Sequence, residues 1–170
     1  MVKFIDPHVD VTGLDRLPDA HVLGCTLYGE ARGSGLYELT AVGEVIMNRV
    51  GDGRYGRGIR GVCLKRKAFS CWWEDSKNRT MTLRMARCLL NGQRFETLAD
   101  GLTWKKIAAL LPGIIDGAFL PPSVPDCLHY HTVPDSQPEA WPKWARGRQP
   151  EVIMGPFKFY ENVDGPTPKR

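Results

Sequence analysis

The chain has 170 residues, of which 42% are hydrophobic and 25% are charged. This is ordinary globular usage, so the composition excludes a disordered or fibrous protein, and the length suits one domain. The net charge of +4 is mild and would suit a polyanionic partner without naming one.

The N-terminal sequence, MVKFIDPHVD, has no apolar segment of the kind that forms the core of a signal peptide. No apolar run approaches the ~18 residues that a membrane-spanning helix needs. We therefore expect a protein that is made in a cytosol without an export signal and does not insert into a membrane.

The five cysteines show no CxxC pair, and their number is odd. With no signal peptide, this pattern predicts reduced and mostly buried thiols, because structural disulfides belong to oxidising compartments. A zinc site would need more closely spaced ligands.

Breaker residues divide the chain into an irregular N-terminal arm (residues 1–18), one folded domain (19–163) and a C-terminal tail (164–170). Apolar residues at helical spacing predict helices over residues 20–31, 36–50, 61–67, 80–91 and 104–111, the last ended by Pro112. Alternating sequences predict short strands within residues 127–133 and 152–163. Together these helices and strands predict an α+β fold that is mainly helical with a small β element. We expect it to form two lobes around a cleft.

A carboxylate interrupts the apolar stripe of the first predicted helix. At ~100° per residue, Glu30 lies ~20° from Leu23 and ~60° from Leu27 around the helix axis. It also lies in the last turn, at the negative end of the helix dipole. Burial and the dipole both favour the protonated acid, which is the form that a general acid needs near neutral pH. The alternative is a buried glutamate that pairs structurally with Arg32 or Arg49.

Aromatic residues gather in the predicted loops and strands, where a ring face could stack on a sugar or a base. These residues are Phe69, Trp72, Trp73, Tyr130, Trp141, Trp144, Phe157, Phe159 and Tyr160. Each of them could equally fill the core.

His129 and His131 would share one face of a strand, so they could bind a metal ion together with Glu30. Two histidines at a strand end are a weak signal, and we predict neither a metal site nor a cofactor. A Cys–His nucleophile built on Cys25 or Cys71 would lack a recognisable activating context.

Several short blocks, taken in order, resemble one family. They are residues 28–32 (YGEAR), 41–42 (AV), 45–50 (VIMNRV), 68–72 (AFSCW), 129–131 (HYH), then Trp144, Gly155 and residues 159–160 (FY). In this order and spacing they resemble the spore-cortex-lytic (SleB-type) cell-wall hydrolases, over about residues 23–160. The block at residues 69–72 resembles the phage and Gram-negative branch of that family. The chain departs from the family pattern at residues 126–127, where Asp-Cys replaces the usual Gly-Ala.

The resemblance implies a lysozyme-like fold related to lytic transglycosylases. The implied substrate is peptidoglycan, cut at the β-1,4 bond between N-acetylmuramic acid and N-acetylglucosamine. Glu30 falls on the catalytic glutamate of the family, so two separate arguments select it. The residues that we expect to contact the glycan, by motif position, are Tyr28, Asn48, Phe69, Ser70, Trp72, His129, Tyr130 and His131.

The implied mechanism needs one carboxylate. Most glycosidases place two around the bond, but Glu38, Asp52, Glu74 and Asp75 are all expected to be exposed. A lytic transglycosylase uses a single acid, and the muramic acid 6-hydroxyl closes on C1 to leave a 1,6-anhydro end.

A chain of this size without an export signal fits a phage or prophage endolysin, which accumulates in the host cytosol and reaches the wall through a pore. A virion-borne lysin or a gene-transfer-agent enzyme would have the same sequence features. We expect a monomer that binds peptidoglycan glycan strands and no nucleic acid.

Three other functions remain open on the sequence. A metal-dependent amidase or peptidase would cut the peptide stem, and a wall-binding module would use the aromatic residues without turnover. A nucleic-acid binder would rest on the net charge and on the Gly/Arg loop over residues 51–61. That loop also supplies Arg54, Arg57 and Arg60 as candidates for docking on an anionic wall.

Overall fold

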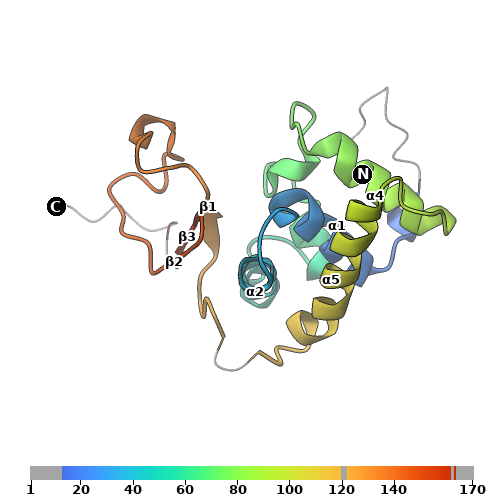
Figure 1. Ribbon diagram of the computed structural model, residues 1–170. Helices are drawn as coiled ribbons and strands as arrows, with labels where there is room; N and C mark the ends of the chain where they lie inside the picture. The colour runs from blue at the N-terminus through green and yellow to red at the C-terminus, as the bar shows by residue number, and fades with distance from the viewer. Residues whose placement is uncertain (1–12, 120–121, 162, 164–170) are drawn as a thin grey trace.

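The computed structural model describes residues 13–119, 122–161 and 163, which form five α-helices and three short strands. The elements are α1 (Asp19–Ala31), α2 (Leu36–Asp52), α3 (Gly58–Cys63), α4 (Arg79–Asn91), α5 (Leu98–Ile115), β1 (His129–His131), β2 (Val152–Met154) and β3 (Phe157–Tyr160). Three 3-10 turns accompany them, η1 (Leu14–Arg16), η2 (Ser70–Trp72) and η3 (Pro138–Ala140). In Figure 1 the sheet lies on one side of the molecule, and α2 lies between it and the other helices. The prediction of a mainly helical α+β fold with a small sheet is confirmed.

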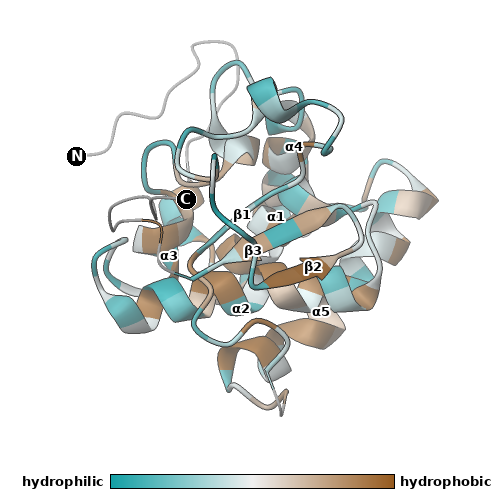
Figure 2. Cartoon of the chain, turned by 90° about the vertical axis from the view of Figure 1, so that its left-hand side faces the viewer, coloured by the Kyte–Doolittle hydropathy of each residue, from teal (hydrophilic) through white to brown (hydrophobic). Residues whose placement is uncertain are grey.

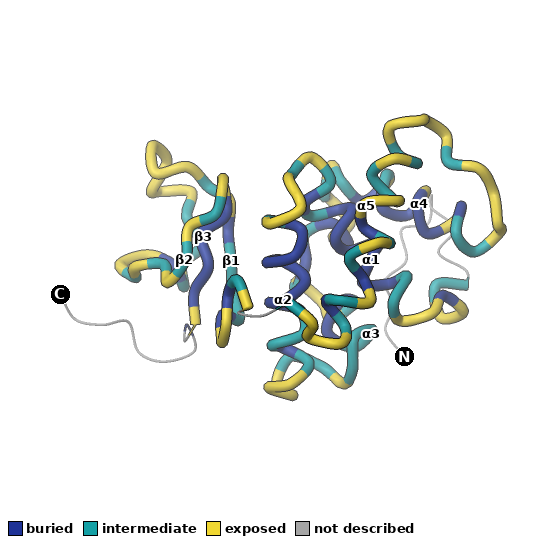
Figure 3. Tube along the Cα trace, turned by 60° about the horizontal axis from the view of Figure 1, so that its bottom comes forward, coloured by how far each residue is buried: buried dark blue, intermediate teal, exposed yellow. Residues whose placement is uncertain are grey.

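Helix α1 is the centre of the helical layer. It is buried without interruption from Val22 to Gly29 and contacts all four other helices. A helix that is apolar on every side is buried on every side, and Figure 3 shows burial concentrated along the inner helices while the connecting segments are exposed. Because Glu30 follows in the last turn, its side chain emerges where α1 leaves the core.

The three strands form one antiparallel sheet in the order β1-β3-β2, which crosses in front of the helices in Figure 2. Tyr130 on β1 pairs with Phe159 on β3. Because side chains alternate along a strand, Tyr130, Phe157 and Phe159 share the face that packs on the helical core. The other face carries His129, His131, Lys158 and Tyr160, and the segment with Trp141 and Trp144 covers it.

Helix α2 fastens the segment that leads into β1. The Asn48 side-chain amide donates hydrogen bonds to the carbonyl oxygens of Val124 and Cys127, both at 3.0 Å. Arg49 donates from Nε to the carbonyl oxygen of Leu128 at 2.6 Å. These contacts join the two layers directly before β1 and therefore fix the position of that strand.

Helix α5 is longer than the sequence predicted. It begins at Leu98, where the Thr97 hydroxyl accepts a hydrogen bond from the Asp100 amide (3.0 Å), and it continues past Pro112 to Ile115. The prediction that Pro112 ends the helix is wrong. Pro112 lies on the exposed face, where the carbonyl left without its N–H partner can be hydrated. Buried residues on both sides of it keep the helix packed.

Two further boundaries differ from the prediction. The single strand expected within residues 152–163 is a hairpin of β2 and β3, because Gly155 turns the chain with a left-handed φ of 54°. The short helix expected over residues 61–67 is α3, which starts three residues earlier inside the Gly/Arg loop.

Part of the predicted N-terminal arm packs on the domain. Leu17 is buried, and Arg60 donates a 2.8 Å hydrogen bond to the carbonyl oxygen of Leu14 in η1. Residues 1–12 of the arm and the predicted tail, 164–170, lie outside the described residues. Within the described part, no helix combines the length and the apolar character needed to cross a membrane. All five cysteines are buried and have free thiols.

Candidate active site

The Glu30 carboxylate lies at the end of α1, against η2 and β1. Its Oε1 accepts hydrogen bonds from the Cys71 backbone amide (2.7 Å) and the Ser70 hydroxyl (3.0 Å), and its Oε2 accepts one from the Tyr130 hydroxyl (2.9 Å). The structure thus brings Glu30, Ser70 and Tyr130 into direct contact, although 40 and 100 residues separate the two donors from Glu30. All three belong to the predicted site.

The close approach of η2 to α1 depends on Gly29. A Cβ atom at this position would overlap the Cβ atom of Cys71 and the Oγ1 atom of Thr82. Since glycine has none, the 3-10 turn lies directly on the helix and points the Cys71 amide at Glu30. The small residue before the glutamate therefore shapes the site.

Tyr130 reaches Glu30 from the sheet. Its ring packs against Phe157 and Phe159, with ring centroids 5.7 and 5.9 Å apart. Burial raises the pKa of the Tyr130 phenol well above its usual value, and the negative charge of Glu30 raises it further. Tyr130 is therefore a neutral hydroxyl near neutral pH, able to donate or to accept a proton in a hydrogen bond.

The two carboxylate oxygens of Glu30 accept hydrogen bonds from different kinds of donor. A backbone amide can only donate, so Oε1, which faces the Cys71 N–H, stays an acceptor in both protonation states. Oε2 faces the Tyr130 hydroxyl, which can rotate and accept instead. When Glu30 is protonated, the proton therefore belongs on Oε2, the oxygen nearer β1.

Glu30 opens into a cleft of about 820 Å³ between the helical layer and the sheet. Sites for small ligands commonly enclose ~300–1,000 Å³. The described residues that line the cleft are Glu30, Arg49, Tyr55, Lys65, Arg66, Lys67, Ala68, Ser70, Trp73, Asn78, His129, Tyr130, His131, Thr132, Val133, Ala140, Pro142 and Trp144. Among them Glu30 is the only acid, and four are basic.

The sequence matches a family model described as Cell Wall Hydrolase over residues 34–160, most of the chain. The chain belongs to the cell wall hydrolase family. Membership supports degradation of peptidoglycan. No curated protein and no solved structure matches the chain.

The family match covers only some of the residues in the site of this cell wall hydrolase. The matched range contains Ser70 and Tyr130 but begins four residues after Glu30. The matched range therefore does not include Glu30, and its place in the site is shown by the contacts described above.

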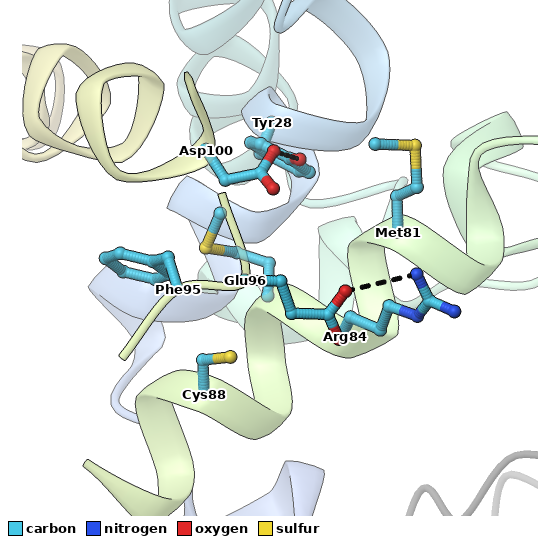
Figure 4. Close-up of a pocket in the computed structure, with 8 residues that line it drawn as sticks. Tyr28, Met81, Arg84, Cys88, Phe95, Glu96 and Asp100 are labelled. Carbon is cyan, nitrogen blue, oxygen red and sulfur yellow. Dashed lines mark hydrogen bonds and ion pairs between the residues drawn. The ribbon is translucent and has the colours of Figure 1, made fainter. Parts of the chain in front are cut away.

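Tyr28 and Trp72 are core residues of the hydrolase. The Tyr28 hydroxyl binds Asp100 in a small pocket beside α4, as Figure 4 shows. The Trp72 indole donates to the Thr26 hydroxyl at 3.1 Å and is 7% exposed. Neither side chain is among those that line the cleft, so the cleft geometry gives no support to the prediction that they contact the glycan.

Phe69 and Asn48 also lie outside the described cleft lining. Phe69 is buried, and the Arg49 guanidinium sits 5.1 Å from its ring centroid. The Asn48 amide is occupied by two backbone carbonyls of the segment before β1. Both residues thus support the site from behind, and their predicted contact with the glycan has no geometric support.

His131 is held in one tautomer. Its Nδ1 accepts the Val133 amide at 3.2 Å, so the hydrogen lies on Nε2, which is 3.0 Å from the Tyr160 hydroxyl. Burial lowers the pKa of His131, and the charge of Lys158 lowers it further. His131 is therefore neutral over most of the physiological range.

The histidines do not form a metal site with Glu30. Tyr130 points at Glu30, so His129 and His131 point to the opposite face of β1. There the His129 ring packs on Trp144, with centroids 5.2 Å apart. The described residues contain no group of three His, Cys, Asp or Glu side chains able to hold a metal ion.

The cysteine alternative lacks an activated thiol. Cys25 and Cys71 are both buried, and burial raises the pKa of each thiol. Neither forms a thiolate near neutral pH, and the thiolate is the nucleophilic form.

Other acids considered as a second carboxylate lie elsewhere. Asp52 pairs with a neighbouring arginine at 2.7 Å, and Glu74 and Asp75 are exposed. Glu38 was expected to be exposed but is half-buried, with its carboxylate against Gly155 at the β2–β3 turn. None of these four lines the described cleft.

The expected glycan contacts left out several residues that line the cleft, although Trp73 was named among the aromatic candidates. Trp73 is the exposed member of the Trp pair, and Asn78 accepts a hydrogen bond from Arg32 at 3.0 Å. The run Lys65–Arg66–Lys67 directly precedes the block over residues 68–72 and offered a signal, because basic residues next to a predicted site suit an anionic ligand.

Proposed function

We propose that this cell wall hydrolase cleaves the β-1,4 bond between N-acetylmuramic acid and N-acetylglucosamine as a lytic transglycosylase, on a lysozyme-like fold. The observation that carries the proposal is that Glu30 is the only acid among the described residues of the cleft. A hydrolytic glycosidase of the usual kind places two carboxylates around the bond, whereas attack by a hydroxyl of the sugar itself needs one.

The proposed reaction has two proton transfers. Protonated Glu30 gives its Oε2 proton to the glycosidic oxygen, and the bond between that oxygen and C1 of muramic acid breaks. The 6-hydroxyl of the same sugar then bonds to C1, and ionised Glu30 takes the proton of that hydroxyl. The product carries a 1,6-anhydro ring, and Glu30 returns to its protonated form.

The neighbours of Glu30 suit both states. Between the two transfers, the Cys71 amide and the hydroxyls of Ser70 and Tyr130 stabilise the carboxylate. The hydroxyl oxygens of Ser70 and Tyr130 also lie beside the reacting carboxylate, where they can face the positive charge that develops at C1.

Digestion of purified cell-wall sacculi tests the class of bond. We expect soluble fragments with new glycan ends and no rise in free amino groups. A rise in free amino groups would identify an amidase or peptidase and overturn the proposal. Protein that pellets with the wall but releases nothing would identify a non-catalytic binding module and overturn it as well.

Chelation separates the single-acid mechanism from the metal-dependent alternative. We expect saturating EDTA to leave the rate of wall lysis unchanged, because no step of the proposed reaction uses a metal ion. Loss of activity with EDTA and recovery with zinc would contradict this mechanism and favour a metal-dependent amidase.

We also propose that the enzyme acts as an endolysin, made in the host cytoplasm and reaching the wall after release. The resemblance of the block at residues 69–72 to the phage branch supports this role. Expression in bacteria should leave cells intact until a pore-forming protein opens their inner membrane. Lysis without the pore would contradict it.

A further inference from the structure

The cleft beside Glu30 carries an unbalanced positive charge. Arg49, Lys65, Arg66 and Lys67 line it, and Glu30 is the only acid among its described residues. Lys65, Arg66 and Lys67 are consecutive and form one wall, which we call the basic strip.

The basic strip lies near the reacting carboxylate. Lys67 precedes Ser70 by three positions, and a chain advances at most ~3.6 Å per residue, so their Cα atoms are within about 11 Å. Ser70 in turn donates a 3.0 Å hydrogen bond to Glu30. A polymer whose reacting bond lies at Glu30 therefore passes beside the strip.

The charges of Arg66 and Lys67 are available to a ligand. Both side chains are exposed, and no acid in the described part of the chain forms an ion pair with either. Arg54 and Arg60, which the sequence suggested for wall docking, instead pair with aspartates at 2.7 and 3.2 Å. None of Arg54, Arg57 and Arg60 is among the described residues that line the cleft, whereas the whole basic strip is. The positive surface that faces the substrate in the cleft is thus the basic strip.

The backbone at Lys67 favours glycine. Its φ is 61°, in the left-handed region that residues with a side chain rarely adopt. The turn is closed by a 3.0 Å hydrogen bond from the Ala68 amide to the Lys65 carbonyl oxygen, which any residue at position 67 would permit. A lysine at this position therefore points to a use for its side chain rather than to a need of the turn.

We propose that Arg66 and Lys67 bind carboxylate groups of the peptide stem of peptidoglycan, and that the basic strip thereby selects stem-bearing glycan. This inference rests on the proposed cleavage at muramic acid. The stem is attached to the same sugar ring whose C1 reacts, so its carboxylates must lie close to Glu30. A neutral polymer of N-acetylglucosamine offers no anion to this wall of the cleft.

Two substrates and two variants test the proposal. Sacculi stripped of phosphate polymers with hydrofluoric acid are used as such, or after their carboxyl groups have been coupled to methylamine. The variant Arg66→Gln/Lys67→Gly removes two charges from the strip and places glycine where the backbone favours it. The control Lys105→Gln/Lys106→Gln removes two charges from exposed positions on α5, outside the described cleft lining.

On the untreated polymer we expect the strip variant to lose about tenfold in kcat/KM, as two partly screened ion pairs allow. The wild type should lose a similar factor on the amidated polymer. On that polymer the strip variant and the wild type should agree within about twofold, because the interaction is already absent. The control variant should match the wild type on both polymers.

Either of two results would overturn the proposal. The first is that the wild type cuts the two polymers at the same rate. The second is that the strip variant loses the same factor on both. For this comparison the strip variant must keep the melting temperature of the wild type. We expect it to fold, because glycine readily adopts the left-handed backbone at position 67.

A binding measurement keeps this inference separate from the proposed function. Co-sedimentation of Glu30→Gln protein with untreated sacculi should weaken when the strip substitutions are added, whatever bond the enzyme cuts. If the wild type produces no new glycan ends, the proposed cleavage fails while the sedimentation result still decides the role of the strip.

Discussion

The groups that hydrogen-bond to Glu30 are uncharged. They are a backbone amide, an aliphatic hydroxyl and a phenol, and the two hydroxyls can either donate or accept. Arg32, one of the two arginines that could have paired with Glu30, donates to Asn78 instead. A carboxyl held in this way can gain and lose a proton without losing its position, as acid–base catalysis requires.

Replacement of Glu30 by glutamine tests this role. The glutamine oxygen can accept from Cys71 and Ser70, and its amide can donate to the Tyr130 hydroxyl, so we expect the free energy of unfolding to change by about 1 kcal/mol or less. Turnover should fall by ~10²–10⁴-fold because the titrating group is lost. Urea unfolding and the rate of wall lysis measure the two effects.

The matched control for that variant is Glu74→Gln, at an exposed position outside the described cleft lining. It should keep its activity and its stability. A loss of ~3–5 kcal/mol in Glu30→Gln, with activity lost only through unfolding, would instead indicate a structural glutamate in a buried ion pair.

Glu30, Ser70 and Tyr130 could be predicted as site residues from the sequence. A carboxylate in an apolar stripe and the spacing of the sequence blocks can both be recognised without a structure. The sequence did not separate Trp72 from Trp73. Which of two adjacent tryptophans is buried depends on the side by which η2 packs on α1, and that side is set by Gly29 and Thr26 in three dimensions.

The sequence predicted those helices in which the apolar residues spaced for a helix are also the buried residues. Helix α4 has a buried face of helical period, α1 and α2 have continuous buried stretches, and all three were found near the expected bounds. The first turns of α5 were missed because Leu98 and Leu102 are 81% and 50% exposed, which removes the amphipathic pattern. The capping by Thr97 was the available signal.

The hydrogen bonds between Asn48 on α2 and the segment before β1 can be tested by substitution. In Asn48→Ala, two carbonyl oxygens lose their donor, so we expect the free energy of unfolding to fall by ~1–3 kcal/mol. Activity of the remaining folded protein should fall as well, because β1 positions Tyr130. Urea unfolding and lysis assays at matched folded fractions would show both.

Asn91→Ala, at the exposed end of α4, is the control and should change neither quantity. A raised KM with unchanged stability in Asn48→Ala would contradict the positioning role. That result would favour the contact with the glycan that the sequence suggested for Asn48.

At the scale of the whole molecule, the cleft joins residues of α1 and α2, the segment over residues 55–78 and the segment over residues 129–144. The sequence suggested two lobes around a cleft, but it could not predict the lining, because local spacing does not tell which loops of the two layers face each other. The charge of the lining followed only from the structure.

The whole-molecule prediction concerns the thiols. All five are buried and free, so the fold does not depend on a disulfide, and reductant should leave the melting temperature within ~1–2 °C. Differential scanning calorimetry with and without reductant measures this. A fall of more than ~5 °C would contradict it, because loss of a structural disulfide typically costs ~2–5 kcal/mol.

The central claim is that one carboxylate, Glu30, carries the reaction without a partner. Mass spectrometry of digested peptidoglycan, before and after borohydride reduction, tests it most directly. We expect 1,6-anhydromuramic ends, which are lighter by one water molecule than hydrolytic products and are unchanged by borohydride. Ends that borohydride reduces would show that water is the nucleophile and that a second residue activates it, which would contradict the single-acid mechanism even if Glu30→Gln is inactive.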